Sequence, residues 1–148
     1  MNELEQIEIM FVAGFGPITQ SDAESKAFYI DALELPLKPM PDNERYRSTE
    51  NGDLAGVKHF ALWPLDQAAQ SCFGSPIWPS DLVVPQSWVE FEVVDISTAS
   101  KQLAAQGYTL LVNNRIEPWG QTVTRLQSPE GSLVGLTRTP WLRDDLSQ

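Results

Sequence analysis

The sequence contains a single cysteine, Cys72, and a single histidine, His59. One cysteine cannot form an internal disulfide, and it excludes a metal site built on paired thiolates. No obvious base flanks Cys72, so we expect its thiol to be unreactive. Any chemistry that needs an imidazole must therefore use His59.

Basic residues are also few, with 10 Lys and Arg against 20 Asp and Glu and a net charge of −10. Affinity for duplex nucleic acid comes mostly from cations that neutralise phosphates, so nucleic acid is not an expected partner. The same charge argues against an anionic membrane surface. It weakly favours a cationic ligand, although an acidic surface can serve solubility alone.

Long apolar runs and several familiar motifs are missing. No run approaches the about 20 residues of a membrane-spanning helix, and residues 1–9 lack the regions of a signal peptide. We therefore expect a cytoplasmic protein. Dinucleotide-binding, P-loop and G-x-S-x-G motifs do not occur. The 148 residues, 42% hydrophobic and 20% charged, have the composition of one globular domain.

The clearest local signal is a hairpin near the end of the chain. Residues 121–126 and 132–137 both alternate in polarity, and Ser128-Pro129-Glu130-Gly131 separates them. Proline suits the second position of a turn, and glycine tolerates the left-handed residue that closes it. Two such runs across a tight turn predict an antiparallel hairpin.

The hairpin belongs to a pattern of strand, helix and three strands that occurs twice. The first copy has a strand at 6–18, with a bulge or end expected at 14–17, and a helix opening at the capping box Ser21–Glu24 and ending near 35. A less regular stretch at 37–49 follows, with a strand at 44–49, and then a strand at 57–65. The second has a strand at 88–94, a helix at 95–106 closed by Gly107, a strand at 108–112, a turn or bulge at 113–119 and the hairpin.

An internal repeat of this kind predicts an α+β fold of two βαβββ modules. Within a single domain spanning 1–148, we expect a first module at 6–66, a Pro-rich connector at 67–86, a second module at 87–140 and a polar tail at 141–148. Each module leaves one sheet face bare, and two such faces can line a ligand cleft.

Alternation along two strands selects the side chains of that cleft. Val89, Phe91 and Val93 are wholly apolar, so we expect them to face the helix. Six residues are then candidates for ligand binding: Phe15, His59, Trp63, Trp88, Glu90 and Glu92.

Three roles stay open for His59 with Glu90 and Glu92: a displaced His-carboxylate metal group, an acid–base pair, or a hydrogen-bonded histidine beside solvated glutamates. Trp63 and Trp88 beside carboxylates suit a flat cationic or polar molecule, although Trp88 fits the core equally well. We expect Trp78 and Trp119 to be packing residues. We expect Arg115 and Arg125 to be solvated charges, and the alternative is that they pair with Glu117 or with an acidic ligand.

Two groups of motifs resemble a known family. They are Ser21-Asp22-Ala23-Glu24 with Ala27-Phe28-Tyr29, and Glu117-Pro118-Trp119-Gly120-Gln121 with Ser128-Pro129-Glu130-Gly131-Ser132-Leu133. Both resemble the signatures of the glyoxalase/bleomycin-resistance/extradiol-dioxygenase superfamily, also called the vicinal oxygen chelate superfamily. The resemblance implies a U-shaped half-barrel cleft and a homodimer.

The resemblance also implies where a metal would bind. The four positions that carry His or Glu ligands in the metal enzymes match Gly14 or Phe15, a residue between His59 and Ala61, Trp88, and Gly135. At least three of these cannot bind a metal, whereas a catalytic divalent metal needs about three protein ligands. We therefore expect no inherited metal site and no cofactor.

Together these features predict a metal-free protein that binds a small organic molecule, as the drug-binding, antibiotic-resistance members of the superfamily do. The alternative is a glyoxalase- or dioxygenase-like lyase or isomerase that uses His59 and Glu90, with or without a divalent metal. A third alternative is an interaction module whose cleft is filled by its own side chains.

Overall fold

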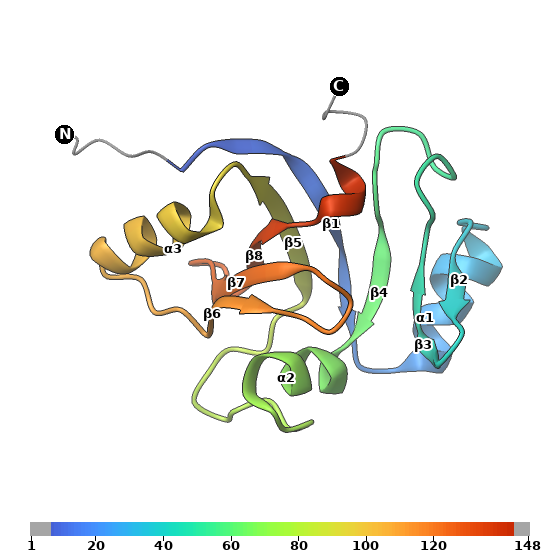
Figure 1. Cartoon of the computed structure of the whole chain (residues 1–148). Helices are drawn as coiled ribbons and strands as arrows, with labels where there is room; N and C mark the ends of the chain where they lie inside the picture. Colours follow the sequence, from blue (N-terminus) through green and yellow to red (C-terminus); the bar gives the residue numbers. More distant parts are fainter. Residues whose placement is uncertain (1–6, 144–148) are drawn as a thin grey trace. The chain divides into compact units, whose positions relative to one another are not determined.

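The structure is a computed structural model that describes residues 7–143. These residues divide into two compact units (Figure 1). One unit contains the described residues up to Ala13 and from Val89 onward, and the other contains residues 14–88. Strand β1 (Ile9–Thr19) contributes its first part to one unit and its second part to the other.

The element order repeats as predicted. The first copy is β1, helix α1 (Asp22–Lys26) continued by the π-helical η1 (Ala27–Ala32), and strands β2 (Lys38–Met40), β3 (Asn43–Ser48) and β4 (Ala61–Pro64). The second is β5 (Ser87–Val93), α3 (Ile96–Ala105), β6 (Val112–Ile116), β7 (Thr122–Gln127) and β8 (Leu133–Arg138). Helix α2 (Leu65–Phe73) lies between the copies, and the 3-10 turn η2 (Pro140–Leu142) follows the second.

Each unit contains an open sheet. In residues 14–88 the strand order is β2-β3-β4-β1, with β4 parallel to β1 and antiparallel to β3. In the other unit the order is β1-β5-β8-β7-β6, and β6, β7 and β8 are antiparallel. The mixed pairing and the repeated element order confirm the predicted α+β fold.

Strand β1 is continuous, so the bulge or end that we expected at residues 14–17 was wrong. Gly16 explains why glycine is needed there. A Cβ at Gly16 would lie 2.0 Å from the carbonyl oxygen of Ala61 on the neighbouring strand β4. Glycine in this strand therefore permits a close approach of two backbones rather than a break.

The first helix begins as predicted and ends early. The Ser21 hydroxyl accepts a hydrogen bond from the Glu24 amide at 3.2 Å, which confirms the capping residue. The helical segment ends at Ala32, and Glu34 follows with a φ of 60°. Neither α1 nor η1 contains a fully buried residue.

The hairpin of β7 and β8 is confirmed in detail. Its pairs run from Thr122 opposite Arg138 to Gln127 opposite Leu133, and Gly131 in the turn has a φ of 88°. Helix α3 covers one face of this sheet. The core there consists of Val93, Ile96, Ala99 and Leu136, with the partly buried Ile7, Phe91 and Leu103. The prediction that Phe91 and Val93 face the helix is therefore confirmed.

The first part of the predicted connector is helical, as the sequence of residues 68–73 before Gly74 allows. Helix α2 buries Ala68, Ala69 and Cys72, and Gly74 caps it in the left-handed conformation. The Trp78 ring lies 5.0 Å from the Phe73 ring, and its Nε1 donates to the Val83 carbonyl at 3.0 Å. Trp78 is thus a packing residue, as predicted.

One expectation near the end of the chain was wrong. A strand forms at 112–116 instead of 108–112, and Asn114 within it has a φ of 53°. The turn η2 extends to the start of the expected polar tail and buries Leu142. The rest of that tail, 144–148, and the predicted start of the first strand at residue 6 lie outside the described residues. None of the described helices combines the length and apolar character needed to cross a bilayer.

The α3 N-cap generates a prediction about pH and stability. The Asp95 carboxylate accepts from the Ser97 and Thr98 amides at 3.0 and 3.2 Å and from the Thr98 hydroxyl at 3.1 Å. The Thr98 backbone amide and then its hydroxyl hold the pKa of Asp95 below its ordinary value. This stabilisation is fully present above about pH 4 and is lost as the pH falls through the lowered pKa.

We therefore expect Asp95→Ala to lower the free energy of unfolding near neutral pH, with a difference that shrinks under acid conditions. Urea titrations at several pH values measure it. Asp31→Ala, which removes an exposed carboxylate paired with Lys26 at 3.2 Å, is the control. A loss of stability in Asp95→Ala that is the same at every pH would contradict the capping role.

Candidate functional site

Four rings gather in the unit of residues 14–88, and we call them the aromatic cluster: Tyr46, His59, Trp63 and Trp88. The register pairs Ser48 of β3 with Ala61 of β4, so Tyr46 and Trp63 lie on one face of that sheet. The Trp63 and Trp88 rings meet edge to face at 5.7 Å, and His59 lies 6.2 Å from Trp88.

Trp88 forms the buried base of the cluster. Trp88 is 3% exposed, and its Nε1 donates to the Ala61 carbonyl at 3.2 Å. A Cβ at Gly14 would lie 3.0 Å from the Trp88 ring and 3.2 Å from the His59 ring. Of the two alternatives for Trp88, burial in the core is therefore observed, and Gly14 makes the necessary room.

Tyr46 and His59 form a hydrogen-bonded pair on top of this base. The Tyr46 hydroxyl lies 2.9 Å from His59 Nε2, and the two rings stack at 6.1 Å. Both residues are half-buried, as is Trp63. A histidine can donate or accept a proton near neutral pH, and a phenol beside it can pass that proton on.

The sequence analysis missed Tyr46, although a signal was present. In the predicted strand at 44–49, Tyr46 lies between two charged residues. Alternation places Tyr46 with Ser48 on the opposite side from Arg45 and Arg47, which identifies it as an inward residue. Phe15, in contrast, contacts Phe60 at 5.3 Å, and Phe60 contacts Tyr29 of η1 at 6.2 Å. The structure therefore places Phe15 with the helix and not in the aromatic cluster.

Glu90 lies in the other unit, in a buried network of polar side chains. Gln121 donates to its Oε1 at 2.9 Å, and Arg125 approaches its Oε2 at 3.4 Å. Arg125 is 2% exposed and also approaches Glu117 at 3.4 Å. Arg115 donates to the same Glu117 oxygen at 2.7 Å. We call Glu90, Arg115, Glu117, Gln121 and Arg125 the buried polar network.

Two expectations for this region were wrong. Arg125 is not a solvated charge, because it lies inside β7 between two carboxylates from other segments. Trp119 is not a core residue, because it is 56% exposed in the turn before Gly120. Its Nε1 donates to the Gln121 side chain at 2.8 Å, which connects the exposed ring to the buried polar network.

Glu92 performs a structural role at the end of the chain. It is fully buried, and its Oε2 accepts from the Thr139 amide at 2.6 Å and from Arg143 Nε. Arg143 also donates to the Val93 carbonyl. No hydrogen-bond partner is found within residues 7–143 for the second carboxylate oxygen, Oε1. Glu92 thus serves to hold the segment after β8.

The residues at the expected metal positions do not fit a metal ion. Within residues 7–143, no three His, Cys, Asp or Glu side chains come together as a candidate metal site. The space beside Gly14 is filled by Trp88 and His59. The space beside Gly135 is filled by Glu90, whose Cγ would lie 2.9 Å from a Cβ at that position. His59, Glu90 and Glu92 each have hydrogen-bond partners within the protein.

No family model and no curated protein sequence matches the chain. Solved structures do. A glyoxalase/bleomycin resistance protein/dioxygenase superfamily member from Vibrio splendidus is 17% identical, covering 90% of this chain and 100% of its own, with a TM-score of 0.54. Methylmalonyl-CoA epimerase from Mycobacterium tuberculosis is 16% identical, covering 94% and 95%, with a TM-score of 0.55.

A third similar structure is a methylmalonyl-CoA epimerase in complex with methylmalonyl-CoA and ammonium. It is 15% identical, covers 90% of this chain and 96% of its own, and has a TM-score of 0.53. The TM-scores and the coverages show a shared fold. The chain has the glyoxalase-like fold of the superfamily that its motifs resemble.

The contact between Glu90 and Gly135 predicts that a methyl group added at position 135 lowers the free energy of unfolding. Gly135→Ala must displace Glu90 from Gln121 and Arg125, which we expect to cost about 1–3 kcal/mol of unfolding free energy. Chemical denaturation measures this cost. In the double variant with Glu90→Ala, the added methyl has room, so its extra cost should fall close to zero. An equal cost in both backgrounds would contradict the contact.

The Glu92–Arg143 pair gives a second stability prediction. Arg143→Ala leaves a fully buried carboxylate without its cation, so we expect a loss of about 3–5 kcal/mol. Arg138 is exposed, and Arg138→Ala should change the free energy by about 0.5 kcal/mol or less. Equal, small effects in the two variants would show that Arg143 does not hold Glu92.

Proposed function

We propose that this protein binds a small planar organic molecule at the aromatic cluster and needs no resident metal ion to do so. The observation that carries the proposal is a set of three half-buried rings beside a buried one. Tyr46, His59 and Trp63 offer aromatic faces and a hydrogen-bonding pair, and the buried Trp88 contacts the rings of His59 and Trp63.

The chemistry of the cluster suits a flat molecule with cationic or polar character. Indole and phenol faces attract cations and stack on planar groups. A net charge of −10 raises the local concentration of cationic ligands. The rings are held by a buried hydrogen bond from Trp88 and by the Tyr46–His59 contact, so little side-chain freedom remains to be lost on binding.

The filled space at Gly14 and Gly135 supports the metal-free part of the proposal. In the superfamily's metal enzymes these positions carry ligands, and here they accommodate Trp88 with His59, and Glu90. Each of the two positions is thus occupied by aromatic or hydrogen-bonded groups, and His59 and Glu90 already have protein partners.

Tryptophan fluorescence quenching by planar organic cations tests this function. We expect saturable quenching, and Trp63→Ala should weaken binding by about 1–2 kcal/mol, or roughly five- to thirtyfold, because a stacking face is lost. Trp141 is 50% exposed and lies in the other unit, so Trp141→Phe is the matched control. Equal weakening of binding in both variants, or no saturable quenching by any of the planar organic cations tested, would contradict the proposal.

A second candidate function is proton transfer at a carbon next to a carbonyl. The observation that favours it is the 2.9 Å contact between the Tyr46 hydroxyl and His59 Nε2, which resembles an acid–base pair. Two of the similar structures are epimerases of a CoA thioester, although at 15 and 16% identity they carry the fold and not the activity.

A deuterium-exchange assay distinguishes proton transfer from ligand binding without a reaction. If His59 transfers a proton, methylmalonyl-CoA in heavy water should exchange its 2-hydrogen in the presence of the protein. His59→Ala should abolish that exchange. Absence of exchange with the unmodified protein, together with tight ligand quenching, would leave the binding function alone.

A further inference from the structure

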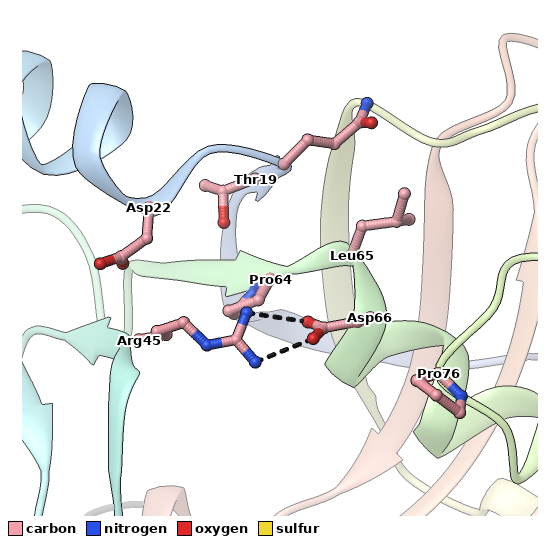
Figure 2. Close-up of a pocket in the computed structure, with 8 residues that line it drawn as sticks. Thr19, Asp22, Arg45, Pro64, Leu65, Asp66 and Pro76 are labelled. Carbon is pink, nitrogen blue, oxygen red and sulfur yellow. Dashed lines mark hydrogen bonds and ion pairs between the residues drawn. The ribbon is translucent and has the colours of Figure 1, made fainter.

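A cavity of about 270 Å³ lies in the unit of residues 14–88, and we call it the α2 pocket (Figure 2). Its lining residues come from the end of β1, from α1, from β3 and from the junction of β4 with α2. They are Thr19, Gln20, Asp22, Arg45, Pro64, Leu65, Asp66 and Pro76. None of them belongs to the aromatic cluster.

The strand registers place this pocket on the other side of the sheet. Thr19 pairs with Pro64, and Ile18 pairs with Trp63, so Thr19 and Pro64 point away from the face that carries Trp63. Arg45 likewise alternates with Tyr46 along β3. The α2 pocket is therefore separate from the proposed ligand site.

The charges in the α2 pocket form an ion pair that solvent can reach. The two terminal guanidinium nitrogens of Arg45, Nη1 and Nη2, donate to the Asp66 carboxylate at 3.1 and 2.8 Å. The two side chains are 46% and 43% exposed. The hydrogen bond from Arg45 holds the pKa of Asp66 below its ordinary value, so both groups are charged at neutral pH. Ion pairs with this much exposure are weak and can be opened by a competing ligand.

Thr19 adds a hydroxyl group to the lining of the pocket. Thr19 is 8% exposed, and Figure 2 shows its hydroxyl pointing into the space between Asp22 and Pro64. A hydroxyl can both donate and accept a hydrogen bond, so this side chain can bind a polar group of a molecule in the pocket.

A ligand that opens the Arg45–Asp66 pair must compensate both charges. A simple anion would satisfy Arg45 and leave Asp66 unpaired, while a simple cation would do the reverse. A zwitterion compensates both at once. Pro64, Leu65 and Pro76 form an apolar part of the lining that suits a short hydrocarbon group. The volume lies just below the usual range for ligand pockets, so the ligand must be small.

We propose that the α2 pocket binds a small aliphatic amino acid, with the ligand carboxylate on Arg45 and Thr19 and its ammonium group on Asp66. The short side chain lies against Pro64, Leu65 and Pro76. This site is independent of the aromatic cluster, and a protein that binds an amino acid here can do so with or without a planar molecule on its other face.

Nuclear magnetic resonance titration of the full chain with L-valine tests the proposal. We expect saturable shifts of the Thr19, Leu65 and Asp66 amide signals at millimolar ligand. N-acetyl-L-valine lacks the ammonium group and L-valinamide lacks the carboxylate, so each should bind at least about tenfold more weakly, which corresponds to 1.4 kcal/mol or more. Binding of either derivative as tight as that of valine would overturn the zwitterion assignment.

Two variants and one control locate the site. Arg45→Gln removes the cation, and Thr19→Val removes the hydroxyl while keeping the shape of a buried side chain; each should weaken valine binding at least about tenfold. Lys26→Gln opens an equally exposed ion pair on the neighbouring helix and should change nothing. The proposal fails if valine causes no saturable shifts at these amides, or if Lys26→Gln weakens binding as much as Arg45→Gln does.

Discussion

The indole of Trp88 occupies space that exists only because residue 14 is glycine. The ring approaches the Gly14 backbone, donates to the Ala61 carbonyl, and supports the rings of His59 and Trp63. Removing a buried tryptophan costs about 3–5 kcal/mol, which is a large part of the total stability of a domain. The half-buried face offered to a ligand therefore depends on this single packing contact.

In the other unit a glycine likewise makes room for a side chain, and here that side chain is charged. Gly135 leaves space for Glu90, which is then held by Gln121 and approached by Arg125. Taking three charged residues out of water is costly, so the network of Glu90, Glu117 and Arg125 adds little net stability. Its effect is to fix the orientation of these side chains on the sheet face opposite α3.

The parts of this fold that could be predicted depend on short-range patterns. The β7–β8 hairpin follows from alternation across a Pro-Glu-Gly turn, and the α3 boundaries follow from Asp95 and Gly107. The βαβββ repeat emerges when those local signals are placed in order. Each of them lies within about ten residues of sequence, where propensity and periodicity determine the outcome.

The candidate site could be predicted only in part, because its contacts join distant segments. His59, Trp63 and Trp88 were identified by alternation and do meet. Alternation could not show that Gly14 makes room for Trp88.

The same limit applies to charges. Arg125 has the alternation of a surface residue. Glu117 lies near it in the sequence and was one possible partner, whereas nothing in the sequence reveals that Glu90, 35 positions away, also approaches it. Glu92 looked like a cleft carboxylate because its partner, Arg143, follows the repeat and was assigned to a polar tail. Burial of a charge depends on its partner, and sequence spacing does not identify that partner.

Metal analysis of the purified protein tests the central claim most directly. The protein is prepared without chelators or added metal, soaked in nickel, zinc, iron and manganese, desalted, and examined by elemental analysis beside His59→Ala and Glu90→Ala. The account predicts no metal in stoichiometric amount in any of the three. About one transition metal per chain in the unmodified protein, lost in both variants, would contradict it, because His59 and Glu90 would then be metal ligands and not a ring-binding and a structural group.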